Sequence, residues 1–307
     1  HSLLAKCGLN LNRPLSIISV CKGLSLNDCY WVVEDGDTTY FDKVNLYDNP
    51  FSNVLAELAF TGYGSSPLSK FRSSPEFTTN GMLPKAWRRV KGEIYLYKGG
   101  TSGFANTGKE PFSEFYSAQV AAAMGLDHIY YSLSLWKGQL CSTCKLFTSK
   151  EISFIPASTL IDTSRITEII AWYDRHGWKE SLSDMLVFDA VIRNTDRHLG
   201  NFGFLVDSHT NKLLQPAPIF DNGLSLYCYA LDSDLANIPQ QEKTLSPALY
   251  ADFDEVARHV MEAKQREALR HLLNFHFKKH PRYNLSSQRL HLLEAAIQSK
   301  ARALLDC

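Results

Sequence analysis

The sequence predicts an α+β protein with two lobes: a strand-rich N-terminal half over residues 1–148 and a helical C-terminal half over residues 149–307. Short alternating and β-branched runs dominate the first half, and apolar residues at three- and four-residue steps dominate the second. Polar motifs gather where the halves meet. This order of elements is typical of two lobes that enclose a cleft, and 307 residues are enough to build both.

The first half is expected to be mainly extended. Strands are predicted at 15–20, 30–35 and 93–100, and a hairpin at 129–136 and 139–147 around Lys137 and Gly138. Helices are predicted at 49–62 and 113–125, the second with Ser113 as its N-cap and Gly125 at its end. Segments 65–87 and 101–111 are rich in polar residues and turn formers, so we expect loops there.

The second half is expected to be helical. Helices are predicted at 163–175, 181–194, 252–275 and 286–304, where apolar residues recur with helical spacing. A hairpin over 202–216 interrupts them.

Composition limits the classes of function. Lys+Arg and Asp+Glu balance at 32 each, so no overall field favours nucleic acid or an anionic membrane, and we expect direct contact with neither. No run of residues has the length of a membrane span or the apolar core of a signal peptide. The seven scattered cysteines predict free thiols in a reducing cytoplasm, and the lone Cys141-x-x-Cys144 pair is interpreted as structural rather than zinc-binding or redox-active.

One stretch, 189–223, carries the strongest chemical signal. Asp196 and Asn201 have the D-x-x-x-x-N spacing of a protein-kinase catalytic loop, and Asp221 follows the hairpin in an apolar-apolar-Asp-x-Gly turn. A carboxylate at Asp196 can orient or deprotonate an attacking hydroxyl. Asn201 and Asp221 offer the hard oxygen ligands that Mg²⁺ prefers. The pattern predicts ATP- and Mg²⁺-dependent phosphoryl transfer in a bilobal, protein-kinase-like fold.

Two neighbours within the catalytic loop have less defined roles. His198 is a candidate catalytic residue, although a loop histidine more often braces the backbone than transfers a proton. Arg197 has two open roles, contact with a phosphate or with a neighbouring acid.

The nucleotide-binding candidates lie upstream. Lys98 ends a strand and Glu114 lies in the next helix, the order in which a kinase places its phosphate-binding Lys and the Glu that pairs with it. The segment TTNGMLPK (78–85) matches no Gly-rich or Walker pattern. Its place in the chain still suits a loop over the triphosphate. The groups it offers are the Thr78 and Thr79 hydroxyls, close backbone approach at Gly81 and the charge of Lys85.

At these positions the chain resembles the HipA-like serine/threonine kinases. The T-D-x-H-x-x-N-F loop of that family matches at 195–202, its P-x-x-D segment matches at 218–221, and its S-x-x-G-x-x-P-K phosphate loop matches at 78–85 with Thr78 in place of Ser. The motifs span roughly 70–225. The resemblance implies Mg·ATP binding and transfer to a Ser or Thr hydroxyl of a protein substrate.

Well-known members of that family are toxins of toxin–antitoxin pairs, so the resemblance also implies a small DNA-binding antitoxin as a partner. It further implies phosphorylation of the enzyme's own phosphate loop, at Thr78 or Thr79 in this chain.

Three alternatives remain from the sequence. The same fold can act as a lipid or small-molecule kinase; the D-R-H order of the loop gives this option some weight, and the lack of a basic surplus counts against a lipid. The fold can be an inactive binding module. The third alternative is a metallohydrolase built on Asp196, His198, His209 and Asp221.

Overall fold

The computed structural model describes residues 7–9, 12–63, 74–79 and 83–306. They form two compact units, each assembled from several stretches of the chain. Unit 1 contains residues up to Gly100, 135–155 and 205–214, and unit 2 contains 101–134, 156–204 and 215–307. The α+β class predicted from the sequence is confirmed. The single boundary expected at residue 148 stays a prediction.

The main sheet has the strand order β1-β2-β4-β3. Its strands are β1 (Lys85–Val90), β2 (Glu93–Gly99), β3 (Ser132–Trp136) and β4 (Gln139–Lys145). The β1–β2 and β3–β4 connections have two residues each, and both residues have positive φ, as type I′ hairpin turns require. Strand β2 and the β3–β4 hairpin are confirmed, whereas β1 begins inside the segment expected to be loop.

The core of unit 1 forms where helix α3 (Asn53–Thr61) packs against β1. Its Ala56 and Phe60 join Ala86, Tyr97 and Cys141 in one buried cluster. Ser52 caps the helix by accepting a hydrogen bond from the Leu55 N–H. The helix predicted at 49–62 is therefore confirmed, somewhat shorter than expected.

Two strands predicted near the N-terminus are wrong. Residues 15–20 belong to helix α2 (Pro14–Cys21), and residues 30–35 have no regular structure. Proline is favoured in the first helical turn, and Ile17 and Val20 pack from the same side of α2 onto a cluster that contains Leu55 and Leu58. Tertiary packing here outweighs the strand preference of the β-branched residues.

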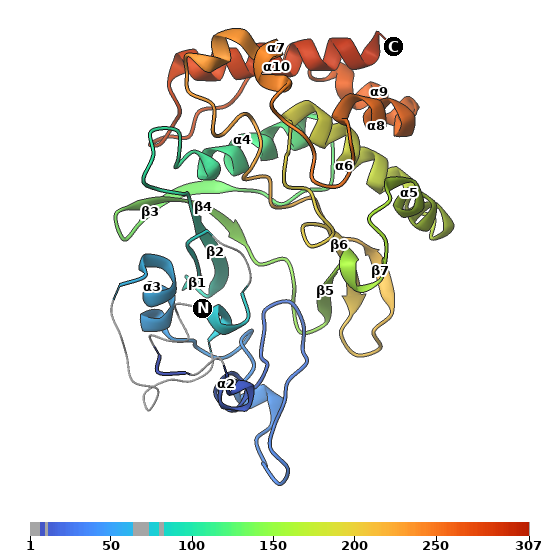
Figure 1. Ribbon diagram of the computed structural model, residues 1–307. Helices are drawn as coiled ribbons and strands as arrows, with labels where there is room; N and C mark the ends of the chain where they lie inside the picture. The colour runs from blue at the N-terminus through green and yellow to red at the C-terminus, as the bar shows by residue number, and fades with distance from the viewer. Residues whose placement is uncertain (1–6, 10–11, 64–73, 80–82, 307) are drawn as a thin grey trace. The chain divides into compact units, whose positions relative to one another are not determined.

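Unit 2 is helical. Its helices are α4 (Glu110–Ala123), α5 (Ile166–Arg175), α6 (Lys179–Ile192), α7 (Ile238–Glu242), α8 (Phe253–Val260), α9 (Ala263–Arg270) and α10 (Ser287–Leu305). Every residue of α6 from Leu182 to Ile192 is buried, so this helix forms the centre of the unit. Helix α10 packs against α6, α8 and α9 (Figure 1). The helices predicted at 163–175, 181–194 and 286–304 are confirmed.

Two helical predictions need correction. The helix expected over 252–275 is divided into α8 and α9, because Met261 is extended (ψ 124°) and Glu262 starts a new capping box with Gln265. Helix α4 begins before Ser113, and its N-cap is Lys109. The Ser113 hydroxyl donates instead to the Ser225 carbonyl (3.0 Å).

A second sheet has the order β5-β6-β7, from β5 (Ile152–Pro156), β6 (Gly203–Asp207) and β7 (Leu213–Pro216). The β6–β7 pair confirms the hairpin predicted over 202–216, and β5 was not predicted. No disulfide joins the cysteines of the described ranges. Within those ranges, no helix combines the length and the apolar character needed to span a membrane.

Candidate functional site in unit 2

The catalytic loop predicted at 196–201 follows helix α6 and is anchored by a buried ion pair. Asp189 and Arg197 are both 0% exposed, and the carboxylate meets the guanidinium through two bonds, Nε to Oδ2 (2.9 Å) and Nη2 to Oδ1 (3.0 Å). Burial raises the pKa of Asp189, against the lowering effect of Arg197. Burial alone would lower the pKa of Arg197, and the neighbouring Asp189 more than offsets it, so the guanidinium stays charged.

Arg197 also binds the loop on its other side. Its Nη1 donates to the carbonyls of Asn201 (3.0 Å) and Phe220 (2.7 Å), and its Nη2 donates to Asn222 Oδ1 (2.7 Å). All five guanidinium N–H groups therefore have acceptors. One buried side chain joins α6, the Asp196–Asn201 loop and the turn that carries Asp221.

The loop is also closed by its own polar side chains. Asn201 Nδ2 donates to the Asp196 carbonyl (2.9 Å) and to Asp196 Oδ2 (3.4 Å), and Asn194 Oδ1 accepts from the Asp196 N–H (3.1 Å). Asp196 is half-buried and Asn201 is buried. With its amide nitrogen directed at Asp196, Asn201 keeps its side-chain oxygen for another partner.

His198 stands apart from this packing. Its side chain is exposed, and the Gly200 N–H donates to its Nδ1 (3.0 Å). A Cβ atom at position 200 would lie 2.9 Å from the imidazole, so a side chain there would displace His198 from its present position. The imidazole thus braces the loop backbone in this structure.

Asp221 lies in a strained turn. Its φ is 55°, an uncommon value for a residue with a side chain, and its N–H donates to the Tyr131 hydroxyl (3.2 Å). The next N–H, that of Asn222, donates to Glu114 Oε2 (2.8 Å). Such strain persists only where surrounding contacts hold it, and it occurs often at functional sites.

Helix α4 presents a polar stripe to the segment that follows Asp221. Glu114 is 1% exposed and accepts from Asn222, while Ser113 and Ser117 bind the carbonyl and the hydroxyl of Ser225 (3.0 and 2.7 Å). The sequence identified only Glu114, as a partner for Lys98. That ion pair would join residues of different units and stays a prediction.

Unit 1 holds the other predicted nucleotide-binding residues. Lys98 on β2 is 7% exposed, so it is not the solvated strand lysine that is commonest in proteins. Lys85 opens β1, opposite Lys98 in the strand register. Thr78 Oγ1 donates to the Leu24 carbonyl (3.0 Å), and Thr79 Oγ1 donates to the Pro75 carbonyl (2.7 Å). Gly81 lies outside the described residues.

A buried acid missed by sequence reasoning holds the start of this loop. Glu76 is 8% exposed; its Oε1 accepts from the Trp87 N–H (2.9 Å), and its Oε2 accepts from the Ser74 hydroxyl. The Trp87 indole N–H donates to Thr79 Oγ1 (2.9 Å). Burial raises the pKa of Glu76, partly opposed by the bonds from Ser74 and Trp87. Strand β1 thus fixes the segment that precedes Gly81.

Metal binding by protein groups alone is limited. Among the described residues no cluster of three or more His, Cys, Asp or Glu side chains is placed to hold a metal ion. His209, a ligand in the metallohydrolase hypothesis, lies in the β6–β7 turn, where its N–H donates to Asp207 Oδ1 (3.0 Å). A kinase-type Mg²⁺ site needs fewer protein ligands, because substrate phosphates and water complete the coordination.

Comparison with known proteins agrees with this architecture. The chain resembles kinases of the HipA-like class, as the motifs predicted: it is similar to the serine/threonine kinase CtkA in sequence and in fold, and to HipA in fold. No family model matches the chain.

The serine/threonine-protein kinase CtkA of Helicobacter pylori is 26% identical over 170 residues, which are 50% of this chain and 49% of the relative. The chain thus spans about half the length of the curated relative it matches. The crystal structure of CtkA has a TM-score of 0.54 at 19% identity, covering 72% of this chain and 91% of that one. HipA of Shewanella oneidensis, in a complex with HipB and operator DNA, has a TM-score of 0.51 at 10% identity, covering 100% of this chain and 84% of that one.

Proposed function

We propose that the protein is a Mg·ATP-dependent serine/threonine kinase of the HipA-like type. One observation carries the proposal: buried Arg197 donates to the carbonyls of both Asn201 and Phe220, so the loop of Asp196 and the turn of Asp221 are held to one guanidinium. Phosphoryl transfer depends mainly on positioning and charge stabilisation, and such an anchor supplies positioning.

The residues divide into roles within that reaction. Asp196 orients the acceptor hydroxyl and accepts its proton. The Asn201 side-chain oxygen and the Asp221 carboxylate are hard donors of the kind Mg²⁺ takes, and the strained turn fixes the second of them. The metal, when bound, neutralises charge on the transferring phosphate. His198 braces the loop, since its imidazole already accepts from Gly200.

The nucleotide-binding roles rest on unit 1 and α4. Lys98 binds phosphate, Glu114 is its acidic partner, and the 78–85 loop covers the triphosphate with Thr78, Thr79, Gly81 and Lys85. The deep burial of Lys98 supports its part of this assignment, because a lysine side chain is rarely buried unless it has a polar or charged partner.

The test compares wild-type protein with Asp196→Asn and Asp221→Asn, using γ-labelled ATP and a cell lysate as acceptor. Each substitution is expected to lower transfer at least about a hundredfold. Asp162→Asn, a charge loss at an exposed carboxylate, serves as the matched control. Unchanged transfer by a folded Asp221→Asn variant would refute the assignment. Parallel incubations with phosphoinositide and small alcohols distinguish a protein kinase from a lipid or small-molecule kinase.

The remaining expectations concern the biological role of the protein. We include in the proposal a toxin role in the cytoplasm and a small DNA-binding antitoxin, supported by the HipA structure solved with HipB and operator DNA. Self-phosphorylation at Thr78 or Thr79 is part of the same proposal; it requires each hydroxyl to leave its bond to Leu24 or Pro75. Mass spectrometry after incubation with ATP and lysate tests both sites.

A further inference from the structure

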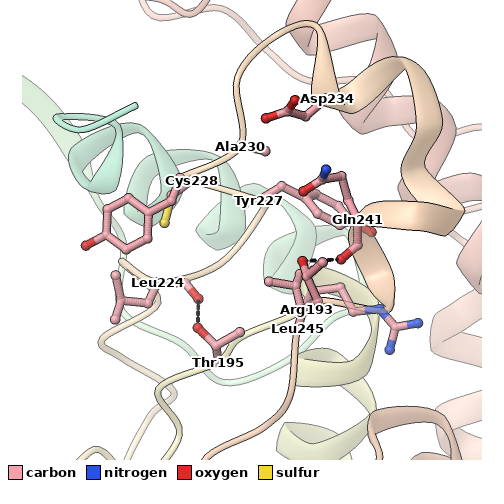
Figure 2. Close-up of a pocket in the computed structure, with 11 residues that line it drawn as sticks. Arg193, Thr195, Leu224, Tyr227, Cys228, Ala230, Asp234, Gln241 and Leu245 are labelled. Atoms are coloured by element: carbon pink, nitrogen blue, oxygen red, sulfur yellow. Dashed lines mark hydrogen bonds between the residues drawn. The ribbon is translucent and has the colours of Figure 1, made fainter. Parts of the chain in front are cut away.

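A pocket of about 200 Å³ lies in unit 2 beside the catalytic loop. Its wall combines the residue that precedes Asp196, the segment that follows Asp221, and the region around α7. The lining residues are Arg193, Thr195, Leu224, Tyr227, Cys228, Tyr229, Ala230, Asp234, Gln241, Thr244 and Leu245. Figure 2 shows Asp234 on one side of the pocket, and Thr195 bonded to Leu224 on another.

The wall is held rigidly. Leu226 and Tyr227 are consecutive residues with positive φ (49° and 53°), a conformation that costs free energy for side-chain-bearing residues. Hydrogen bonds fix both: the Leu226 N–H donates to the Ile192 carbonyl (2.7 Å), and Arg289 Nη2 donates to the Tyr227 carbonyl (2.7 Å). The pocket is therefore formed before any ligand enters.

The cationic residue in the wall is already neutralised. Arg193 pairs with Asp254 (2.8 Å) and Glu242 (3.1 Å), and Lys300 pairs with the same two carboxylates (2.8 and 3.1 Å). Two positive and two negative groups balance in this network. Arg193 thus adds no net charge to the pocket.

Asp234 is the uncompensated charge. Its Oδ2 accepts from the Leu231 N–H (2.8 Å), and no cation among the described residues forms an ion pair with it. Apart from Arg193, the rest of the wall is mainly apolar or aromatic, with the side chains of Thr195, Gln241 and Thr244 adding polar groups. This combination suits a side chain with an apolar stem and a positive tip, which means Lys or Arg.

The size and position of the pocket indicate which molecule contributes the Lys or Arg side chain. Pockets that enclose small-molecule ligands measure about 300 to 1,000 Å³, so this one suits a single side chain better than a lipid headgroup or a free substrate. Thr195 lines the pocket and directly precedes Asp196, so the pocket adjoins the loop that would hold the acceptor hydroxyl. An extended peptide advances about 3.3 Å per residue, so we expect the side chain in the pocket to come from a residue near the phosphorylated one.

We propose that this pocket binds a Lys or Arg side chain of the acceptor protein, within about two residues of the phosphorylated Ser or Thr. Asp234 forms the ion pair, and Leu224, Leu245 and Tyr227 cover the aliphatic stem. The inference deepens the proposed kinase function and rests on it for the position of the acceptor.

The experiment uses fluorescent peptides with one central Ser, each carrying a single Lys or Gln at one position near it. Binding is measured by anisotropy, and phosphate incorporation by label transfer from ATP. Wild-type protein is expected to favour Lys over Gln at one position by about tenfold, the effect of one charge-assisted hydrogen bond. Asp234→Asn keeps an acceptor for Leu231 and should reduce that preference to about twofold. Asp234→Lys should favour Glu instead.

The matched controls are Asp162→Asn and Asp162→Lys, which make the same charge changes at an exposed residue and should keep the wild-type preference. Equal binding of the Lys and Gln peptides at every position overturns the proposal, as does a preference that survives in Asp234→Asn. Asp234-dependent binding without phosphate transfer would refute the kinase function while supporting a basic-peptide pocket. The two failures are therefore distinguishable.

Discussion

Replacement of Arg197 by Met tests the buried anchor of the site most directly. Met fills much of the same volume and removes the charge together with five donors. Asp189 would then be a fully buried carboxylate without a counterion, and the carbonyls of Asn201 and Phe220 would lose their donor. Breaking a buried ion pair from one side costs about 3–5 kcal/mol, a large part of the about 5–15 kcal/mol that stabilises a domain.

Thermal unfolding measures this loss. At about 2–4 °C per kcal/mol for a unit of this size, the melting temperature should fall by about 6–20 °C. Arg258→Met, the same substitution at an exposed position of α8, should change it by less than about 2 °C. The double variant Asp189→Leu/Arg197→Met should recover part of the loss, because no carboxylate remains buried and unpaired.

The pH dependence gives a second check with a defined sign. Without Arg197 the pKa of Asp189 rises further above its ordinary value. A carboxyl group whose pKa is higher in the folded than in the unfolded state destabilises the fold as pH rises, so the deficit of Arg197→Met should shrink as pH falls from about 8 to about 5. A deficit below about 1 kcal/mol at neutral pH, or a double variant less stable than the single one, would refute the account of the anchor.

Three further predictions concern other contacts. Glu76→Gln keeps an acceptor for the Trp87 N–H and removes a carboxyl group whose pKa is raised by burial. In the wild type this group should lower the free energy of unfolding as pH rises above about 4.3. Denaturant titrations of the variant at several pH values should lack this pH-dependent loss. Asn201→Ala should raise the Mg²⁺ concentration for half-maximal phosphate transfer at least about tenfold, whereas a lower maximal rate at unchanged Mg²⁺ dependence would contradict its role as a ligand. Ser286→Ala removes the N-cap of α10, in which Ser286 Oγ accepts from the Arg289 N–H (3.1 Å), and should cost about 1 kcal/mol in thermal unfolding.

The fold could be predicted where periodicity and packing agree. Helices such as α5 and α10 follow their apolar spacing, and the β3–β4 turn follows from Lys137-Gly138. The strand predicted at 15–20 fails because β-branched residues there form a helix start after Pro14 and pack with α3. The break between α8 and α9 depends on the Glu262–Gln265 capping box. The helical spacing of apolar residues continues through this break, so it predicted one helix instead of two.

The site could be predicted as far as its motifs reach. Asp196 and Asn201 are hydrogen-bonded to each other, and Asp221 lies in a turn tied to the same arginine. The sequence left Arg197 between two roles, and Asp189 was not identified. An acid within the apolar run VFDAVI, eight residues before an arginine, is the signal that was available, because such an acid needs a buried partner. Tyr131 and Asn222 gave no signal, since their roles arise from tertiary contacts alone.

The segment from Asp221 to Ala230 has a consequence for the order in which ligands bind. One end carries a proposed metal ligand, and the other forms the wall of the acceptor pocket. Between them, Ser113 and Glu114 of α4 bind the backbone at Ser225 and Asn222, and Ser117 binds the Ser225 hydroxyl. Any coupling between two ligands that meet this shared segment is reciprocal. A factor by which Mg·ATP changes the affinity for a basic acceptor peptide must therefore equal the factor by which that peptide changes the affinity for Mg·ATP.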